Sequence, residues 1–326
     1  MRNVALVGTM LRYRVASLLL PFFLLAPALH GRLGEFRWTY VLGVVALCAS
    51  YVVATCLNDV FDLDVDRVNH PDAKDRPLVT GSATPRQLIV VAAVLAAVAL
   101  AAGATVGPIA VAVIAASLAL NVAYSVPPVR LCSRPVAAPV VLGLAYVALP
   151  YLLGLAASGG VPDAYDVRVL ACFVVLFTGR MLLKDFRDRR GDAAFGKRTF
   201  LLTFGKEATL AAVLACVVGG DALLVTVLPV HPLLIAATES YFVAIVVQLY
   251  RLRRAVDIDT ERFAIALGAR MGNAVVLTLL GFVLLAGAGA RAVEEGAFVI
   301  VLAAMFWFAF LYVSSRPQAA LAAYRG

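Results

Sequence analysis

Long apolar segments separated by short polar stretches account for most of the chain. The segments are 13–30, 39–57, 87–105, 107–124, 136–157, 166–183, 207–229, 232–250, 271–289 and 295–315. Each is about 17 to 25 residues long, the length that a transmembrane helix needs. They lack the short alternating pattern of outer-membrane strands. The pattern therefore predicts an all-α protein, a polytopic membrane bundle of nine to ten transmembrane helices around a central cavity.

The composition agrees with this prediction. Hydrophobic residues make up 63% of the 326 residues, charged residues make up 15%, and the mean hydropathy is +0.93. Soluble globular proteins carry about a quarter charged residues, so that class is excluded. Because no linker or low-complexity tract interrupts the chain, we expect one transmembrane domain over 1–326. A weak repeat, about 39–125 and 136–230, suggests an internal duplication.

The first apolar segment allows two interpretations. It follows the basic residues Arg2, Arg12 and Arg14, and it ends in Ala26-Pro27-Ala28, which matches the form of a signal-peptide cleavage site. The chain returns to apolar sequence within about ten residues, and a first span can itself direct insertion. We therefore favour a retained span over a cleaved one.

Two acidic strings with the same spacing follow long apolar segments. They read Asn58-Asp59-x-x-Asp62-x-x-x-Asp66 and Lys184-Asp185-x-x-Asp188-x-x-x-Asp192. Offsets of three, four and seven residues fall on one face of a helix, so each string directs three carboxylates to one point. Clustered carboxylates repel one another unless a cation joins them, and Mg²⁺ commonly bridges carboxylate and phosphate oxygens. The strings therefore predict a site for Mg²⁺ and a diphosphate.

The distribution of the 28 Lys and Arg residues predicts the orientation. With a cytoplasmic N-terminus, the side opposite the strings carries only Arg32, Arg37, Arg168 and Arg291. The positive-inside rule then places both termini and both strings in the cytoplasm. The net charge of +8 indicates topology and attraction to anionic lipid headgroups or substrates. No basic stripe with interleaved aromatic residues indicates nucleic-acid binding.

Cysteine and histidine give no sign of a further site. The five cysteines form no C-x-x-C pair, so no disulfide or zinc site is indicated. The histidines, His30, His70 and His231, stand alone in the sequence, and we expect them to be incidental.

Two further motifs accompany the strings. Tyr124-Ser125-x-Pro127-Pro128 lies between them, and Gly196-x-x-Thr199 follows the second. In this order the motifs resemble the signatures of the UbiA-type intramembrane prenyltransferase superfamily. The resemblance implies that the strings bind Mg²⁺ and the diphosphate of a polyprenyl donor that enters from the bilayer. Members of the superfamily are typically nine-helix bundles, so 295–315 is an addition, the first segment is removed, or one segment is re-entrant or interfacial.

The resemblance assigns roles residue by residue. The metal ligands are Asp59, Asp62, Asp66, Asp185, Asp188 and Asp192. The residues that bind the diphosphate are Asn58 and Lys184. Basic side chains near the strings are further candidates for diphosphate binding, namely Arg67, Arg76, Arg180, Arg187 and Lys197. For most of these arginines, a role in setting topology is an equal alternative.

Catalysis requires stabilisation of the carbocation that develops on the prenyl carbon. An aromatic face in a dry pocket provides it, and Tyr124 is favoured over Tyr51 because Tyr124 belongs to a motif. We assign catalytic roles to Asp62, Asp188 and Tyr124. Glu239, deep in an apolar segment, is a candidate for orienting an acceptor, with helix-to-helix hydrogen bonding as the alternative.

These observations predict a Mg²⁺-dependent membrane prenyltransferase. It passes the prenyl group of a polyprenyl diphosphate to a lipophilic acceptor, most often aromatic in this superfamily, and releases diphosphate. One alternative is a terpene cyclase that uses the same aspartates and quenches the cation intramolecularly. A second is a cation-coupled secondary transporter, which typically carries its acidic groups near the bilayer midplane. A non-catalytic scaffold does not account for the repeated acidic spacing.

Overall fold

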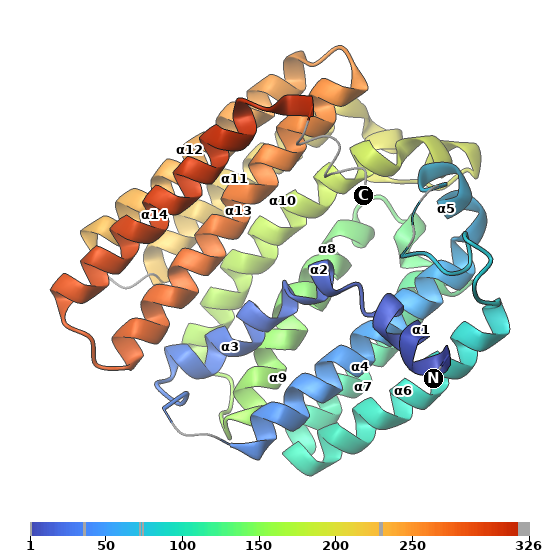
Figure 1. Ribbon diagram of the computed structural model, residues 1–326, viewed down its shortest axis with the longest axis horizontal. Coiled ribbons are helices and arrows are strands. Elements are labelled where there is room, and N and C mark those ends of the chain that lie inside the picture. Colours follow the sequence, from blue (N-terminus) through green and yellow to red (C-terminus); the bar gives the residue numbers. More distant parts are fainter. Residues whose placement is uncertain (1, 35–36, 72, 74, 228–230, 319–326) are drawn as a thin grey trace.

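The computed structural model describes residues 2–34, 37–71, 73, 75–227 and 231–318 of the chain. Throughout this part the elements are helical and no strand occurs (Figure 1). The all-α prediction is confirmed. The chain is an integral, multi-pass membrane protein.

The helices differ in length. The short ones are α1 (Arg2–Met10), α2 (Tyr13–Ala16), α3 (Leu19–Leu29) and α5 (Leu63–Asn69). The long ones are α4 (Trp38–Phe61), α6 (Pro85–Val106), α7 (Pro108–Ser125), α10 (Ala164–Ala194), α11 (Phe200–Val227), α12 (Pro232–Arg254), α13 (Ile258–Gly287) and α14 (Ala292–Ser314). A π-helical turn joins α8 (Ala137–Gly143) to α9 (Leu149–Ala157), so that the three form one continuous stretch.

Eight of these stretches in the described residues are long and apolar enough to cross a membrane, among them α14. The helix α10 is not one of the eight, because charged residues occur along its whole length, Asp166, Arg168 and Arg180 in its earlier turns and the second acidic string in its last turns. Its middle turns, from Val169 to Gly179, are free of charged residues and fall in the predicted segment 166–183. The expected count of nine to ten spanning helices is therefore not confirmed.

The first apolar segment is not one continuous helix. The structure divides 13–30 into α2 and α3, and Arg12, which precedes α2, adopts the left-handed conformation with a φ of 42°. The 11 residues of α3 span about 16 Å at 1.5 Å per residue, roughly half of a bilayer's hydrocarbon core. The prediction of a full span over 13–30 is therefore not confirmed.

Local sequence explains where several helices begin. Thr84 forms a capping box with Gln87 at the start of α6, and Asp163 forms one with Asp166 at the start of α10. Proline occupies the first positions of α6, α7 and α12, where its missing N–H is not needed.

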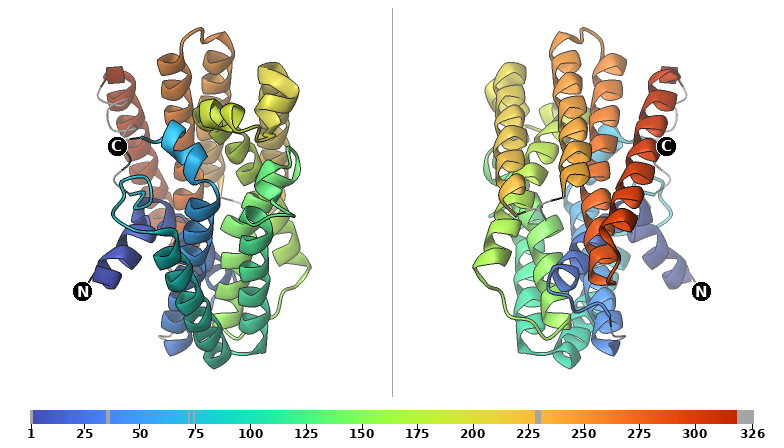
Figure 2. Two further views of the ribbon diagram at one scale, coloured as in Figure 1. Left: turned by 90° about the vertical axis from the view of Figure 1, so that its right-hand side faces the viewer. Right: turned by 90° about the vertical axis from the view of Figure 1, so that its left-hand side faces the viewer.

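The helices surround a common interior (Figure 1). The helix α4 packs along α6 and α7, α10 packs along α11, and α12 and α14 pack against α13. The largest group of buried apolar side chains joins α3, α9 and α10 to α11, α12, α13 and α14. At one end of the bundle, α5 packs on the last turns of α10, which brings together the two segments that carry the acidic strings (Figure 2).

Candidate active site at one end of the bundle

A cavity of about 830 Å³ opens between the helices. At the end near α5 its lining is polar and includes Asn58, Asp62, Asp66, Arg76, Asp188, Asp192 and Lys197. Further along the bundle its lining is apolar and includes Phe22, Phe173, Phe177, Val217 and Phe242. The cavity therefore combines a charged mouth with an apolar interior.

The first acidic string spans a break between two helices. Asp59 lies in the last turn of α4, Asp62 lies at the junction, and Asp66 lies on α5. Arg12 donates from Nη2 to both carboxylate oxygens of Asp59, at 2.6 and 2.7 Å. Arg76 contacts Asp59 at 3.3 Å and also pairs with Asp66. Burial lowers the pKa of Arg76 to about 10, so its guanidinium stays charged at neutral pH.

Asp62 is buried and has several polar partners. Arg130 donates to one carboxylate oxygen at 2.7 Å, and Lys197 and Asn58 donate to the other at 2.9 and 3.0 Å. Burial raises the pKa of Asp62, but the charges and hydrogen bonds of Lys197 and Arg130 outweigh this effect and hold the pKa below its usual value. Asp62 is therefore ionised at neutral pH and able to act as a metal ligand.

The second string lies near the end of α10. Asp188 is buried, and it contacts Lys184 Nζ at 3.0 Å, Arg187 Nε at 2.9 Å and His70 Nε2 at 3.3 Å. Asp185 is half-buried and lies outside the cavity lining, where its carboxylate accepts a long contact of 3.5 Å from the backbone N–H of Leu201.

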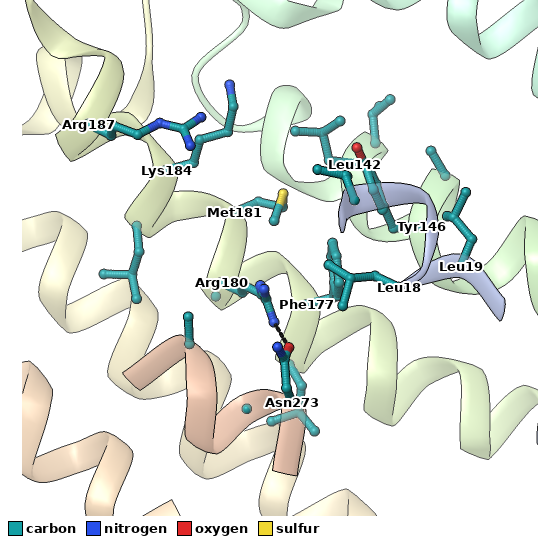
Figure 3. A pocket seen from close by; sticks show the side chains of 18 of the residues that line it. Leu18, Leu19, Leu142, Tyr146, Phe177, Arg180, Met181, Lys184, Arg187 and Asn273 are labelled. Carbon is teal, nitrogen blue, oxygen red and sulfur yellow. Dashed lines mark hydrogen bonds between the residues drawn. The ribbon is translucent and has the colours of Figure 1, made fainter. Parts of the chain in front are cut away.

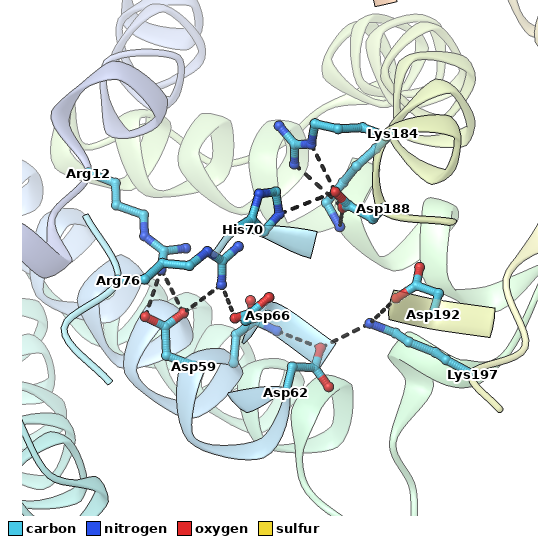
Figure 4. A network of polar contacts seen from close by, with 12 residues as sticks. Arg12, Asp59, Asp62, Asp66, His70, Arg76, Lys184, Asp188, Asp192 and Lys197 are labelled. Atoms are coloured by element: carbon cyan, nitrogen blue, oxygen red, sulfur yellow. Dashed lines mark hydrogen bonds and ion pairs between the residues drawn. The ribbon is translucent and has the colours of Figure 1, made fainter. Parts of the chain in front are cut away.

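The two strings converge on one site, as Figure 4 shows. The ammonium of Lys197 lies 2.9 Å from Asp62 and 3.6 Å from Asp192, so one cation contacts both strings. A glycine permits this approach. The N–H of Gly191 donates to the side chain of Asn69 at 2.7 Å, and a Cβ at Gly191 would lie 2.6 Å from the carbonyl oxygen of Val65.

The donor set fits a divalent metal ion. The ligands offered are carboxylate oxygens, which Mg²⁺ prefers. Asp192 Oδ1 is buried, and no hydrogen bond reaches it from any residue in the described part of the chain. Its nearest cation is the Lys197 ammonium at 3.6 Å, beyond hydrogen-bond distance, so a metal ion at this position would satisfy a buried oxygen that is otherwise costly.

Most of the predicted site residues lie in or beside the cavity. The ring of Tyr124 lines it, as does Tyr51, which makes an edge contact with Tyr146 at 6.3 Å between centroids. Asp59 lies behind Arg12 and Arg76, outside the lining. Arg67 is exposed and pairs with Asp64 at 2.9 Å, away from the cavity. Glu239 also lies outside the lining, where it interacts with Asp221.

Three residues at the site were missed by sequence reasoning. Arg12, His70 and Arg130 contact the aspartates, although we expected His70 to be incidental and counted Arg12 only as a basic residue of the N-terminus. Arg130 follows the Tyr124 motif closely, and this proximity was an available signal. For Arg12, which is 47 residues from Asp59 in sequence, no local signal exists.

A second acidic group lies at the start of α10, far from the strings along that helix. Its members His30, Asp163 and Asp166 lie close enough to share a metal ion. Asp166 is fully buried and already accepts hydrogen bonds from Tyr151 and from the backbone N–H of Asp163, and it contacts His30 at 2.9 Å. We therefore interpret the group as the cap of α10, in which these contacts hold the Asp166 carboxylate.

Comparison with known proteins gives consistent matches. The sequence pattern of the UbiA prenyltransferase family matches residues 18–269. The bacteriochlorophyll synthase 33 kDa chain of Cereibacter sphaeroides is 31% identical over 227 residues, which cover 67% of this chain and 72% of that protein. The digeranylgeranylglyceryl phosphate synthase of Halobacterium salinarum is 35% identical over 167 residues, which cover 51% of this chain and 57% of that protein.

The fold has also been observed before. A UbiA homolog from Archaeoglobus fulgidus, bound to GPP and Mg²⁺, superposes with a TM-score of 0.58 at 17% sequence identity. The superposition covers 92% of this chain and 99% of the other. At this identity the match is evidence for the fold alone.

Proposed function

The chain belongs to the UbiA prenyltransferase family, and from this premise we propose that it transfers a prenyl group from a polyprenyl diphosphate to a lipophilic acceptor within the membrane. The reaction depends on Mg²⁺ and releases diphosphate. The single observation that carries the proposal is the convergence of both acidic strings on the charged mouth of an otherwise apolar cavity.

Asp62, Asp66, Asp188 and Asp192 line the cavity and would hold Mg²⁺ there. Asp59 and Asp185, the other two predicted ligands, lie outside the lining. The metal, when bound, supplies positive charge that stabilises the departing diphosphate. The UbiA homolog from Archaeoglobus fulgidus was observed bound to GPP and Mg²⁺, and this supports the donor class and the metal that we propose here.

The cations around the strings are suited to hold the diphosphate. Arg76, Lys184, Arg187 and Lys197 line the cavity together with Asn58. In the structure these cations pair with the aspartates, and on substrate binding they can transfer their N–H donors to phosphate oxygens while a metal satisfies the carboxylates. Arg12 and Arg130 join this set because they contact Asp59 and Asp62. Arg67 contributes only to the exposed surface of α5.

The apolar part of the cavity is suited to the prenyl chain. Phe22 contacts Phe173 and Phe177 edge-on, with centroids 5.6 and 6.3 Å apart, and Tyr146 stacks on Phe177 at 5.3 Å. These rings exclude water from the chain and present π-faces toward a developing carbocation. Tyr124 lines the cavity near the charged side chains of Lys184 and Lys197, and we assign it the same stabilising role.

The placement of the acidic groups does not favour the transporter alternative. The carboxylates lie at the end of α4, on α5 and in the last turns of α10, whereas a transporter is expected to hold them near the midplane. The terpene cyclase alternative uses the same aspartates and differs only in the fate of the cation.

The test is a reconstitution of purified protein with Mg²⁺, labelled prenyl diphosphates of graded chain length and a panel of aromatic and lipid acceptors. We expect diphosphate release and a product whose mass equals acceptor plus prenyl group, both abolished by EDTA. Release without any acceptor, yielding a hydrocarbon or terpene alcohol, favours the cyclase. No release under any condition overturns the proposal.

A further inference from the structure

A charged and an amide side chain meet in the apolar part of the cavity. Arg180 on α10 donates from Nη1 to Asn273 Oδ1 on α13 at 2.6 Å, and both residues line the cavity (Figure 3). The guanidinium carbon of Arg180 also lies 5.8 Å from the centroid of the Phe177 ring. These contacts hold the guanidinium on the wall formed by α10 and α13.

The depth of this pair follows from helix geometry. Arg180 lies four residues before Lys184 and eight before Asp188, which is about 6 and 12 Å along α10. All three residues share one face of the helix. If the diphosphate is held by Lys184 and, through a metal ion, by Asp188, a prenyl chain directed into the apolar interior has its first carbon near the depth of Arg180. Arg180 is therefore placed beside the reacting carbon, one turn away from the diphosphate.

The wall beside Asn273 is lined by small residues. Gly268, Ala269 and Gly272 line the cavity on the same helix, and a Cβ at Gly272 would meet no atom within 4 Å. This space adjoins the Arg180–Asn273 pair. It is available to a second molecule next to the prenyl donor.

The chemistry of the pair indicates what that molecule carries. Since Asn273 Oδ1 accepts from Arg180, the amide presents its Nδ2 donors, and a guanidinium has donors only. The pair thus complements an oxygen that accepts hydrogen bonds, and its positive charge favours an anionic one. An anion bound here also lies close enough to offset the developing carbocation.

We propose that Arg180 and Asn273 bind an anionic oxygen substituent, a carboxylate or a phosphate, of the prenyl acceptor. This inference rests on the proposed prenyl transfer and narrows its acceptor class. It replaces the sequence-based assignment of Arg180 to the diphosphate. The residues act by positioning the acceptor carbon or oxygen against the first carbon of the donor.

The experiment compares acceptors that differ in one group, with geranyl diphosphate and Mg²⁺ as the constant donor. The two pairs of probes are a hydroxybenzoic acid with its carboxamide, and a prenylated glycerol phosphate with its dephosphorylated diol. KM is measured for donor and for acceptor in the wild type, in Arg180→Gln, in the conservative Arg180→Lys and in Asn273→Asp, which gives Arg180 an internal carboxylate. Ser240→Ala is the matched control, because it removes another intramembrane polar contact, the hydrogen bond from Trp307 Nε1 to Ser240 Oγ, which lies outside the cavity lining.

We expect the wild type to prefer at least one anionic probe over its neutral partner. Arg180→Gln and Asn273→Asp should raise the KM for that probe about tenfold or more, since a charge-assisted hydrogen bond is lost, while the KM for geranyl diphosphate stays within about twofold. Arg180→Lys should restore part of the loss, and Ser240→Ala should change neither KM.

Three results overturn the inference: equal losses for the anionic and neutral members of a pair, a rise in the donor KM instead of the acceptor KM, or transfer that no anionic probe stimulates above its neutral partner. The proposed function fails separately, if the wild type releases no diphosphate from geranyl diphosphate with any acceptor.

Discussion

At the residue scale, Asp62 and Asp188 have the most Lys and Arg partners among the aspartates that line the cavity. We expect Asp62→Asn and Asp188→Asn to lower turnover about a hundredfold or more, because each removes a carboxylate charge needed to hold the metal. Steady-state rates with a prenyl diphosphate, together with circular dichroism to show that the helices persist, check this prediction.

The matched control for these variants is Asp64→Asn. Asp64 lies on α5 between the two string positions, but its side chain is 66% exposed and pairs with Arg67 at the surface. It should retain wild-type turnover. Wild-type turnover in Asp62→Asn or Asp188→Asn instead would remove that carboxylate from the mechanism.

A second residue-scale prediction concerns Lys197, which contacts both strings. Burial lowers the pKa of Lys197, but Asp62 raises it further, so that the net pKa lies above the usual value and the ammonium is charged at neutral pH. We expect Lys197→Gln to raise the KM for prenyl diphosphate about tenfold, the equivalent of one charge-assisted contact. Arg198→Gln, at the exposed neighbouring position, should leave it unchanged. An unchanged KM in Lys197→Gln contradicts the role.

The residues of the site could be predicted from sequence only in part. The aspartates could be predicted from their spacing, because three carboxylates on one helical face need a cation. Arg12 and Arg130 could not be assigned in this way, because they reach the aspartates across 47 and 68 residues of chain. Arg67 was included because it follows Asp66, but one residue corresponds to about 100° of rotation on a helix, which turns it toward Asp64 and solvent.

At the element scale, the approach of α5 to α10 depends on Gly191. A side chain there meets backbone as well as side-chain atoms, at 2.6 Å from the Val65 carbonyl oxygen and 2.7 Å from Asn69 Nδ2. We expect Gly191→Val to push α5 away, separate the strings and destabilise the protein by about 1 to 3 kcal/mol, the usual cost of overpacking. Turnover should fall with it, and thermal unfolding in detergent measures the loss.

Gly219→Val serves as the control for this variant. Gly219 lies within α11, and a Cβ there meets no atom within 4 Å, so both stability and turnover should be nearly unchanged. A Gly191→Val protein as stable and active as the control would show that the two helices tolerate a wider separation.

The elements were predictable to the extent that hydropathy specifies them. Eight apolar stretches, from α4 to α14, coincide with predicted segments to within a few residues at most of their ends. Segment 13–30 is equally apolar, but the structure divides it at Ser17 and Leu18, between α2 and α3. Hydropathy carries no information about such a division, because the residues on both sides of it are apolar.

At the scale of the whole molecule, the repeat suggested by the sequence remains a prediction. The helix α4, which ends in the first string, packs along α6, and α10, which ends in the second, packs along α11. Each string is thus presented by a long helix packed on the apolar helix that follows it. The break at Asp62 has no counterpart in α10, which continues as one helix through Asp185, Asp188 and Asp192.

The membrane orientation is the last prediction, and it follows from the charge distribution along the chain. We expect the end of the bundle that carries both strings to face the cytoplasm, since the loops there hold most of the Lys and Arg residues. Two exposed loop positions, one at each end of the bundle, can be used to measure this orientation. Ser82 lies between α5 and α6, and Val161, which is 69% exposed, lies between α9 and α10.

In a variant whose five native cysteines are replaced by alanine, Ser82→Cys and Val161→Cys should respond oppositely to a membrane-impermeant maleimide. In intact cells we expect labelling of Val161→Cys only, and in inverted membrane vesicles labelling of Ser82→Cys only. The reverse pattern would place the strings, and with them the diphosphate site, on the outer face. Labelling of both positions from one side would contradict an odd number of membrane crossings between the two loops.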